Sequence, residues 1–410
     1  MRPRLRQGAF PTMTRTPFPR LLFVVEHPFT TRDEARFGIA DLRAHFDVEV
    51  LDVTDCRGTV DRHSSHVGKS LDWVRSVDTV DGAVGAIAVA SPSVLVSNLS
   101  PSALRTRVFV AARAIGAVTV EFTLGYTPGD VRSGHDFASR IRRRVLQARS
   151  WWALAGDLVR IPRTREHTLI RPEVRVAAGA AMRARHRPRE ELVVATHSHD
   201  WDSFLLASQN QHRSAGRRPS IVYLDQEMGY HPDYRVSHLR VPIRPRGFYC
   251  SLNRYLRRLE DRSGIEVIVA AHPRADRARL DRRLPRWRVS DQPTVHAVQD
   301  ASLVLTHNST AASFAVAWRR PVVVLADRDL LRSWEGIFTT ALAEALGAPI
   351  DMIDGDAMPS FPSTIDAPRY DEFVRDYLTE RPDDRRSSWT ITAESLVAYL
   401  EAGGERRIQR

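Results

Sequence analysis

The sequence has few cysteines and almost no lysine. Its cysteines do not have the close spacing of a metal-binding pair. Cys56 and Cys250 are the only two cysteines in 410 residues, and they lie far apart. So little cysteine fits a reducing cytoplasm, where disulfides are rare. Lys69 is the only lysine, so arginine supplies nearly all of the positive charge behind the net charge of +11. Such a basic chain favours polyanions, phosphorylated lipids or an anionic membrane face as partners.

The sequence also lacks a membrane span and a signal peptide. Residues 82–104 carry no charge, but five serines, Asn98, Pro92 and Pro101 interrupt the segment. Residues 1–6 lack the apolar core of a signal peptide. We therefore expect a soluble or peripheral cytoplasmic protein. No segment resembles a nucleic-acid-binding module, so we expect no nucleic-acid partner.

The chain does contain a series of short apolar runs that alternate with helical segments. The three clearest runs span residues 267–271, 301–305 and 322–325. Uninterrupted runs of this length are typical of strands buried on both faces of a parallel α/β sheet. A similar alternation begins with the run 21–25, which predicts an earlier domain of the same kind.

The length of the chain and this pattern predict two domains. Residues 1–19 are expected to be a flexible basic tail, and residues 20–210 a Rossmann-like acceptor domain. The polar segment 211–219 is the candidate linker. Residues 217–386 are expected to form a second Rossmann-like domain that binds the nucleotide donor, followed by a final helix at 387–410.

Polar residues follow two of the apolar runs. His272 and Arg274 come after the first run, and Asn308, Ser309 and Thr310 come after the second. Open α/β sheets bind ligands at the carboxyl ends of their strands. The later three residues are expected to open and cap a helix, whose free N–H groups attract an anion. Two such ends on neighbouring strands predict a site for a nucleotide monophosphate or diphosphate, whereas either cluster alone could be a simple cap or turn.

The same residues carry a family resemblance. His272-Pro273 followed by Asn308-Ser309-Thr310 resembles the His-Pro and Ser/Thr motifs of GT-B glycosyltransferases that use CMP-activated sugars. These are the bacterial sialyl-, polysialyl- and Kdo-transferases, with the CDP-glycerol glycerophosphotransferases as more distant relatives. The resemblance covers the second half of the chain. It implies a GT-B fold, in which two Rossmann-like domains with parallel sheets face one another across a cleft and the last helix crosses back. It also implies that His272, Ser309 and Thr310 contact the donor phosphate, with no metal and no cofactor.

Sugar transfer also needs a carboxylate, as general base or as nucleophile. Asp225 and Glu227 are the candidate catalytic residues, because their strand opens the second domain and ends at its ligand-binding edge. Asp225 could equally cap a loop. In the sialyltransferases that the motifs resemble, the base lies in the first domain, where Glu26 and Glu121 are available.

Two further clusters invite a functional interpretation. The segment 197–202 holds two histidines and two aspartates, which could bind a metal or line a cleft beside the acceptor. We expect no metal, because no third group of ligands accompanies them. Residues 137–152 predict a basic amphipathic helix that ends in two tryptophans. Such a helix fits contact with an anionic membrane, or a solvated basic face that packs its apolar stripe on the core.

The sequence thus predicts a glycosyltransferase that moves a sugar from a cytidine-nucleotide donor to a cell-surface polysaccharide or glycolipid precursor. Its partners would be the nucleotide sugar, a glycan or lipid-linked glycan acceptor, and an anionic membrane. The alternatives are a CDP-glycerol-type polyol-phosphate transferase and a non-catalytic GT-B scaffold that binds anionic glycans.

Overall fold

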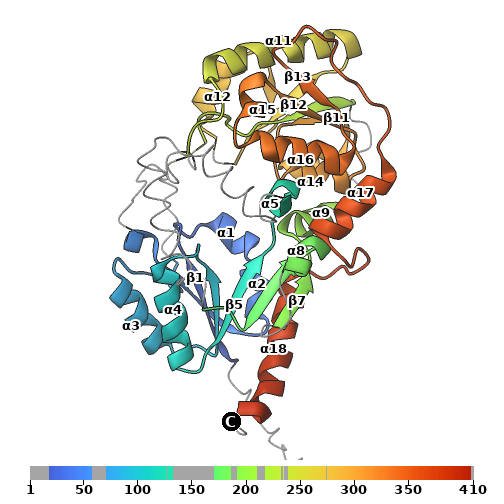
Figure 1. Ribbon diagram of the computed structural model, residues 1–410. Helices are drawn as coiled ribbons and strands as arrows, with labels where there is room; N and C mark the ends of the chain where they lie inside the picture. Colours follow the sequence, from blue (N-terminus) through green and yellow to red (C-terminus); the bar gives the residue numbers. More distant parts are fainter. Residues whose placement is uncertain are drawn as a thin grey trace, which may run out of the picture.

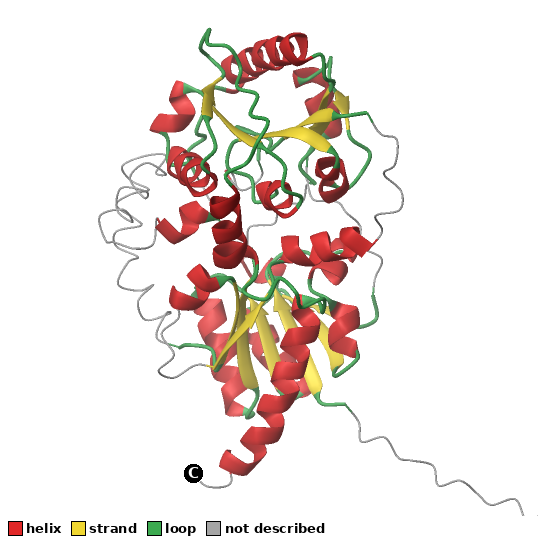
Figure 2. Ribbon diagram, turned by 90° about the vertical axis from the view of Figure 1, so that its right-hand side faces the viewer, coloured by secondary structure: helices red, strands yellow, loops and turns green. Residues whose placement is uncertain are grey.

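The computed structural model contains two α/β domains, each built around one parallel sheet (Figures 1 and 2). It describes residues 18–57, 71–125, 127–132, 170–185, 192–209, 218–231, 234, 239–273 and 275–407. The basic helix expected at 137–152 and the phosphate-binding candidate Arg274 lie outside the described residues. The predicted fold class, with two parallel α/β sheets, is confirmed.

The first sheet has seven strands in the order β3-β2-β1-β4-β5-β6-β7. The strands are short and rich in β-branched residues, and β1, β2, β4 and β6 are largely buried, as a sheet covered on both faces requires, whereas the edge strand β3 is not. The strands are β1 (Arg20–Val25), β2 (Asp47–Asp52), β3 (Val74–Ser76), β4 (Val94–Asn98), β5 (Val118–Thr123), β6 (Val174–Ala178) and β7 (Leu192–Thr196).

Helices of this domain connect the strands, and several begin at polar caps. Thr30 and Asp33 form a reciprocal capping box, and Thr79 and Ser102 cap the next two long helices. The helical elements are α1 (Thr31–Arg36), α2 (Ile39–Arg43), η1 (Thr54–Arg57), α3 (Val80–Ala90), α4 (Ala103–Ala114), α5 (Pro128–Arg132), α8 (Ala180–Arg185) and α9 (His199–Gln209).

The second sheet has six strands in the order β10-β9-β8-β11-β12-β13. The strands are β8 (Ser220–Leu224), β9 (Val267–Ala270), β10 (Arg288–Val289), β11 (Ala301–Thr306), β12 (Val322–Ala326) and β13 (Ile350–Met352). The helical elements are α11 (Pro245–Ser263), α12 (Arg277–Arg283), α13 (Thr294–Gln299), α14 (Ala312–Ala317), α15 (Arg328–Arg332), α16 (Gly336–Leu346), α17 (Ala367–Phe373), η3 (Val374–Leu378) and α18 (Ser388–Arg407).

The two domains exchange helices. Trp201 and Leu205 of α9, which follows the last strand of the first sheet, pack into a core cluster of the second domain. In the other direction, Trp389 and Leu396 of α18 pack into the main core of the first domain. Figure 1 shows α18 running along the lower, first domain after the chain leaves the upper one. The second domain is therefore covered in part by α9, which follows the strands of the first sheet. The first domain is covered in part by α18, which follows the strands of the second sheet.

A second junction joins the first domain to the segment before α18. Gly179 follows β6 with a φ of +73°, and a Cβ there would lie 2.3 Å from the carbonyl oxygen of Asp376. Only glycine allows both this backbone conformation and this close approach. Nearby, Arg183 donates two hydrogen bonds of 2.7 Å to Glu380, and the Ser198 N–H donates to the Leu378 carbonyl at 2.8 Å.

The described helices include none that combines the length and the apolar composition needed to cross a bilayer.

Candidate functional site

The order of strands in the second sheet changes the expected layout of the site. β9 and β11 were predicted to be neighbours, but both pair with β8, which lies between them. Two strand spacings put their carboxyl ends roughly 10 Å apart. The residues that follow β8, Asp225 to Glu227, therefore lie between His272 and Asn308. The chain also reverses its strand order between β8 and β11, and open α/β sheets bind ligands at such a switch point.

Hydrogen bonds between side chains bridge this switch point. Gln226 donates from Nε2 to the Asn308 side-chain oxygen at 2.6 Å and accepts from the Asn308 backbone N–H at 3.0 Å. The Asn308 side-chain amide also donates to Glu335 at 3.1 Å, and the Tyr234 hydroxyl donates to the other oxygen of Glu335. Burial raises the pKa of Glu335, and these two donors oppose that change. The network fixes the loop that carries the predicted Ser/Thr motif.

The Ser/Thr motif itself forms a turn instead of a helix cap. α14 begins at Ala312, and its N-cap residue, Ala311, makes no side-chain capping bond. The Ser309 hydroxyl accepts from the Ala311 N–H at 3.2 Å, while Thr310 is exposed. The expectation that Asn308, Ser309 and Thr310 directly open and cap the helix is therefore wrong, because the helix begins two residues after Thr310 and its N-cap is Ala311. The physical reason is that Asn308 is bound to Gln226 and Glu335, which holds the chain out of helical geometry.

His307, which precedes this motif, is part of the core. Its Nδ1 lies 2.7 Å from the Leu325 carbonyl oxygen, and its Nε2 lies 3.1 Å from the Tyr223 hydroxyl. A carbonyl only accepts, so Nδ1 carries the proton and Nε2 accepts from Tyr223. Burial lowers the pKa of His307 to about 4, so the ring is neutral at pH 7.

Asp225 and Glu227, the predicted catalytic pair, are both deeply buried. Asp225 is 3% exposed and Glu227 is 2% exposed. Neither carboxylate oxygen of Asp225 makes a hydrogen bond of normal geometry with a described residue, although the N–H groups of Gln226 and Glu227 face it. Burial raises the pKa of Asp225 to about 6, against the opposing charge of Arg283. A carboxylate of this kind can change its protonation state near neutral pH.

Glu227, in contrast, forms ion pairs and a hydrogen bond with several partners. Its Oε1 lies 3.2 Å from Arg283 Nη2 and 3.9 Å from Arg279 Nη1, and it accepts from the Asp276 backbone N–H at 3.3 Å. Glu227 also has a φ of +50°, which is uncommon for a residue with a side chain. These contacts join the loop after β8 to α12, the helix that follows His272.

His272 lies against a second histidine that the sequence analysis did not select. The rings of His231 and His272 are 4.7 Å apart between centroids and nearly perpendicular. Both are half-buried. Next to His231, the ring of Tyr230 is 39% exposed, and the guanidinium groups of Arg279 and Arg283 lie 5.2 and 4.6 Å from its centroid.

The carboxylates that were considered in the first domain have structural partners. Glu26, at the end of β1, accepts hydrogen bonds from the Ser100 N–H at 3.0 Å and the Ser100 hydroxyl at 2.6 Å. It thereby joins the loops that follow β1 and β4. Glu121 binds Arg105 and, at 3.1 Å, Arg175 on the neighbouring strand.

The segment 197–202 serves the junction between the domains. His197 Nδ1 lies 2.7 Å from the Thr379 hydroxyl, while the His199 ring stacks near Trp389. Asp202 accepts hydrogen bonds from the Ser388 backbone N–H, at 2.8 Å, and from its hydroxyl, at the start of α18. The side chains point to different partners, and no three His, Cys, Asp or Glu groups converge on one point within the described ranges.

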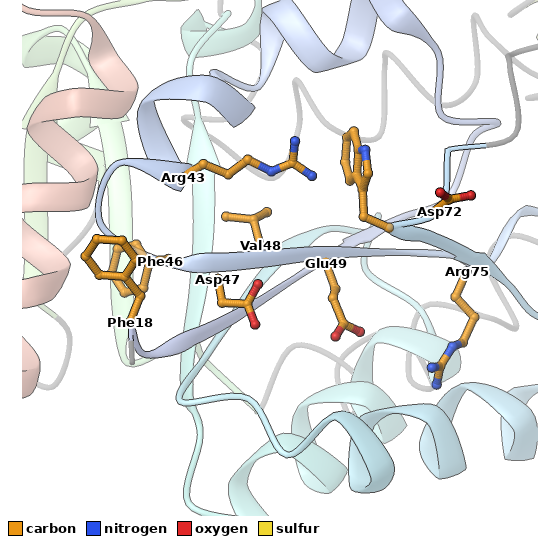
Figure 3. A pocket seen from close by; sticks show the side chains of 9 residues that line it. Phe18, Arg43, Phe46, Asp47, Val48, Glu49, Asp72 and Arg75 are labelled. Carbon is orange, nitrogen blue, oxygen red and sulfur yellow. The ribbon is translucent and has the colours of Figure 1, made fainter. Parts of the chain in front are cut away.

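A hollow lies away from these strand ends, at the opposite edge of the first sheet. Figure 3 shows this space of about 750 Å³, which borders the amino-terminal ends of β1 and β2 and the start of β3. The Arg43 guanidinium lies 4.1 Å from the centroid of a Trp73 ring on its wall. Parallel sheets bind ligands at their carboxyl ends, so the candidate site is the edge formed by β8, β9 and β11 and not this hollow.

Known structures share the arrangement of the whole chain. The glycosyltransferase SnogD from Streptomyces nogalater aligns with a TM-score of 0.50 and 16% identity, over 93% of this chain and 99% of that chain. The fold is GT-B. VinC, a glycosyltransferase solved in complex with DTDP, aligns with a TM-score of 0.48 and 13% identity, over 93% and 100% of the two chains. The S. aureus MnaA–UDP structure gives 0.49 and 11%, over 95% and 97%. No protein-family model and no curated protein sequence matches the chain.

Sequence reasoning missed several residues at this edge of the second sheet. His231-Pro232 repeats the His-Pro pattern at the next strand end, which was a usable signal. Gln226, Glu335 and Arg283 gave no such signal. Each acquires its place only through a partner that is distant in the sequence, and no spacing rule connects them.

Proposed function

We propose that this protein transfers a sugar from a nucleotide donor, with a cytidine nucleotide as the specific hypothesis, to a cell-surface polysaccharide or glycolipid precursor. The observation that carries the proposal is the gathering of His272, His231 and the Asn308–Thr310 turn around the switch point of the second sheet. These groups offer hydrogen-bond donors at the edge where α/β sheets bind ligands.

In this proposal the donor phosphate lies between His272 and the Ser309-Thr310 turn. Ser309 and Thr310 would add hydroxyl donors, and Thr310 is exposed to receive a ligand. Asn308 would act by positioning this turn, because its side chain is bound to Gln226 and Glu335 and its backbone N–H donates to Gln226. Stabilising the charge that develops on a leaving phosphate is usually the largest part of such catalysis. Arg274 remains a proposed phosphate ligand from the sequence alone.

The proposed catalytic carboxylate is Asp225. In the transfer, the bond between the anomeric carbon of the sugar and the donor phosphate oxygen breaks, and a bond from that carbon to the acceptor oxygen forms. The acceptor proton passes to the base, and the nucleotide leaves with the phosphate charge. A pKa of about 6 suits a group that must accept a proton near pH 7. Because Asp225 is 3% exposed, the loop after β8 has to shift when substrates bind. Glu227 would then hold Arg283 and α12 in place, which makes it the second candidate.

A thermal-shift screen tests the donor class. A ligand that binds only the folded protein raises its melting temperature. CMP, CDP, UDP, DTDP, GDP and their sugars should be compared on the wild-type protein, and we expect the largest shift with a cytidine nucleotide. A larger shift with a uridine or thymidine nucleotide would keep the transferase proposal and replace the donor. No shift with any nucleotide would remove the proposal.

Activity separates a transferase from a glycan-binding scaffold. With the best nucleotide sugar and a lipid-linked glycan acceptor, nucleotide release should depend on both substrates. It should also persist after treatment with EDTA, because the proposed chemistry uses no bound metal. Loss of activity with EDTA and recovery with a divalent cation would contradict the metal-independent part of the proposal.

A further inference from the structure

One face of α11 carries a row of exposed arginines. α11 buries Phe248, Leu252, Tyr255 and Leu256 against the second sheet and ends at Gly264, which has a φ of +67°. On the opposite side, at a helical rotation of 100° per residue, five exposed residues fall within an arc of about 80°. They are Arg246, Cys250, Arg254, Arg257 and Asp261. We call these five residues the α11 face.

The positive charge of the α11 face is not neutralised within the described part of the chain. No described residue forms an ion pair or a side-chain hydrogen bond with Arg246, Arg254 or Arg257. Asp261 is the one acidic member, and it does not reach Arg257 within ion-pair distance. By contrast, the arginines of the same region that flank the face have acceptors: Arg258 donates to the Gly355 carbonyl at 2.9 Å, and Arg286 pairs with Glu260 at 2.9 Å.

Exposed apolar side chains also lie near both ends of the helix α11. Val241, just before the helix, is 40% exposed. Met358 is 64% exposed, and its loop is held at the other end of α11 by a hydrogen bond from Arg262 to the Pro359 carbonyl. Figure 1 shows α11 as the outermost helix of the upper domain, on the side turned away from the first domain. The exposed residues of the α11 face are therefore accessible to a large, flat partner.

We propose that the α11 face is a docking surface for an anionic lipid membrane. The three unpaired arginines lie along about 17 Å of helix, at a rise of 1.5 Å per residue, and can contact several lipid headgroups together. Arginines near an anionic bilayer attract its surface charge, and Val241 and Met358 can enter the boundary between headgroups and acyl chains. A nucleic acid would use the same charge but would gain nothing from two exposed aliphatic side chains. The proposal stands apart from the sugar-transfer reaction and concerns a different surface.

Vesicle sedimentation tests the docking surface. The full chain should bind vesicles that contain phosphatidylglycerol and should not bind vesicles of phosphatidylcholine alone. The triple variant Arg246→Gln, Arg254→Gln, Arg257→Gln should weaken binding on the order of 100-fold, from a factor of about five for each arginine. The matched control is the triple variant Arg32→Gln, Arg332→Gln, Arg385→Gln, which removes the same charge from exposed positions on other elements and should change binding only slightly. Equal losses in the two variants would overturn the proposal, because general charge attraction would then explain binding.

A fluorescent label on Cys250 reports which surface is bound. Cys250 is exposed in the middle of the α11 face, and the only other cysteine is removed by Cys56→Ser. An environment-sensitive label should shift its emission to the blue on anionic vesicles, and the shift should vanish in the α11 glutamine variant. Binding without a shift would place the contact elsewhere and overturn the proposal. Tighter binding to a random-sequence RNA than to the vesicles, lost in the same variant, would assign the face to nucleic acid.

Discussion

Arg283 Nη2 lies 3.2 Å from Glu227 Oε1, and this pair is almost completely shielded from solvent. The side chain of Glu227 is 2% exposed and that of Arg283 is 9% exposed. Arg283 also donates to the Tyr249 hydroxyl at 2.6 Å. One guanidinium therefore joins the loop after β8, the long helix α11 and its own helix α12, at the edge where we place the donor.

The first prediction follows from that pair. Arg283→Met should destabilise the fold by about 3–5 kcal/mol, because it leaves the buried Glu227 charge with only the more distant Arg279, at 3.9 Å, as a cation. The double variant Arg283→Met, Glu227→Gln should recover much of the loss. Unfolding in denaturant measures both. Arg277→Met on the same helix is the control, since its pair with Asp281 is more than half exposed and should contribute no more than about 1 kcal/mol. A similar small loss for Arg283→Met would show that the pair is not shielded in solution.

The second prediction concerns His272. Hydrogen bonds to charged groups contribute roughly 1.5–3 kcal/mol each, so His272→Ala should weaken CMP binding about 10- to 150-fold. Ser309→Ala should cause a smaller loss, because backbone donors of the turn remain. Uncharged cytidine lacks the phosphate and should bind both variants as it binds the wild type. Calorimetric titration measures all three proteins, and equal losses for CMP and cytidine would move His272 away from the phosphate.

The third prediction separates binding from chemistry at Asp225. Asp225→Asn keeps the size of the side chain and removes its basicity, so transfer should fall by at least about 100-fold. Nucleotide affinity should stay within a few-fold, because the proposed role is toward the acceptor. Steady-state kinetics and nucleotide titration give the two values. Full activity in Asp225→Asn would direct attention to Glu227 or to the first domain.

The fourth prediction is a pH dependence of stability. Burial raises the pKa of Asp225 from 3.8 to about 6, so the folded protein holds this proton more tightly than the unfolded chain does. The stability contributed by the protonated carboxyl is present below about pH 4 and is lost as the pH rises through about 6. Asp225→Asn cannot ionise, and at pH 7.5 it should be more stable than the wild type by about 3 kcal/mol. Denaturant unfolding at about pH 4.5 and 7.5 should show that this difference falls to about 1 kcal/mol at the lower pH. A variant that is less stable at both values would contradict the burial of the charge.

The fifth prediction concerns the junction between the domains. Gly179→Ala should destabilise the protein by more than about 2 kcal/mol, because alanine is strained at a φ of +73° and its Cβ would meet the Asp376 carbonyl. Gly85→Ala, in the exposed helix α3 with no atom near its added Cβ, should be neutral or stabilising by up to about 1 kcal/mol. Thermal unfolding of both variants is the measurement. Equal stability of the two variants would show that the junction after β6 accommodates the added Cβ at position 179 without loss of stability.

The sequence by itself determined the parallel sheets. Runs such as 267–270 and 322–325 are apolar without interruption, and a strand that is covered on both faces needs such a composition wherever it lies. The positions of His272, Ser309 and Asp225 at strand ends followed directly, because a strand must end where the apolar run ends.

Only the tertiary structure decided which strand ends meet. The insertion of β8 between β9 and β11 depends on the crossover connections, and local composition does not encode them. Local composition also does not encode the pairing of side chains that are far apart in the sequence. Gln226 finds Asn308 and Glu227 finds Arg283 because the strands and helices that carry them pack together. Burial also separates Asp225 from Glu227: desolvation raises the pKa of Asp225, whereas Glu227 has a cation at ion-pair distance.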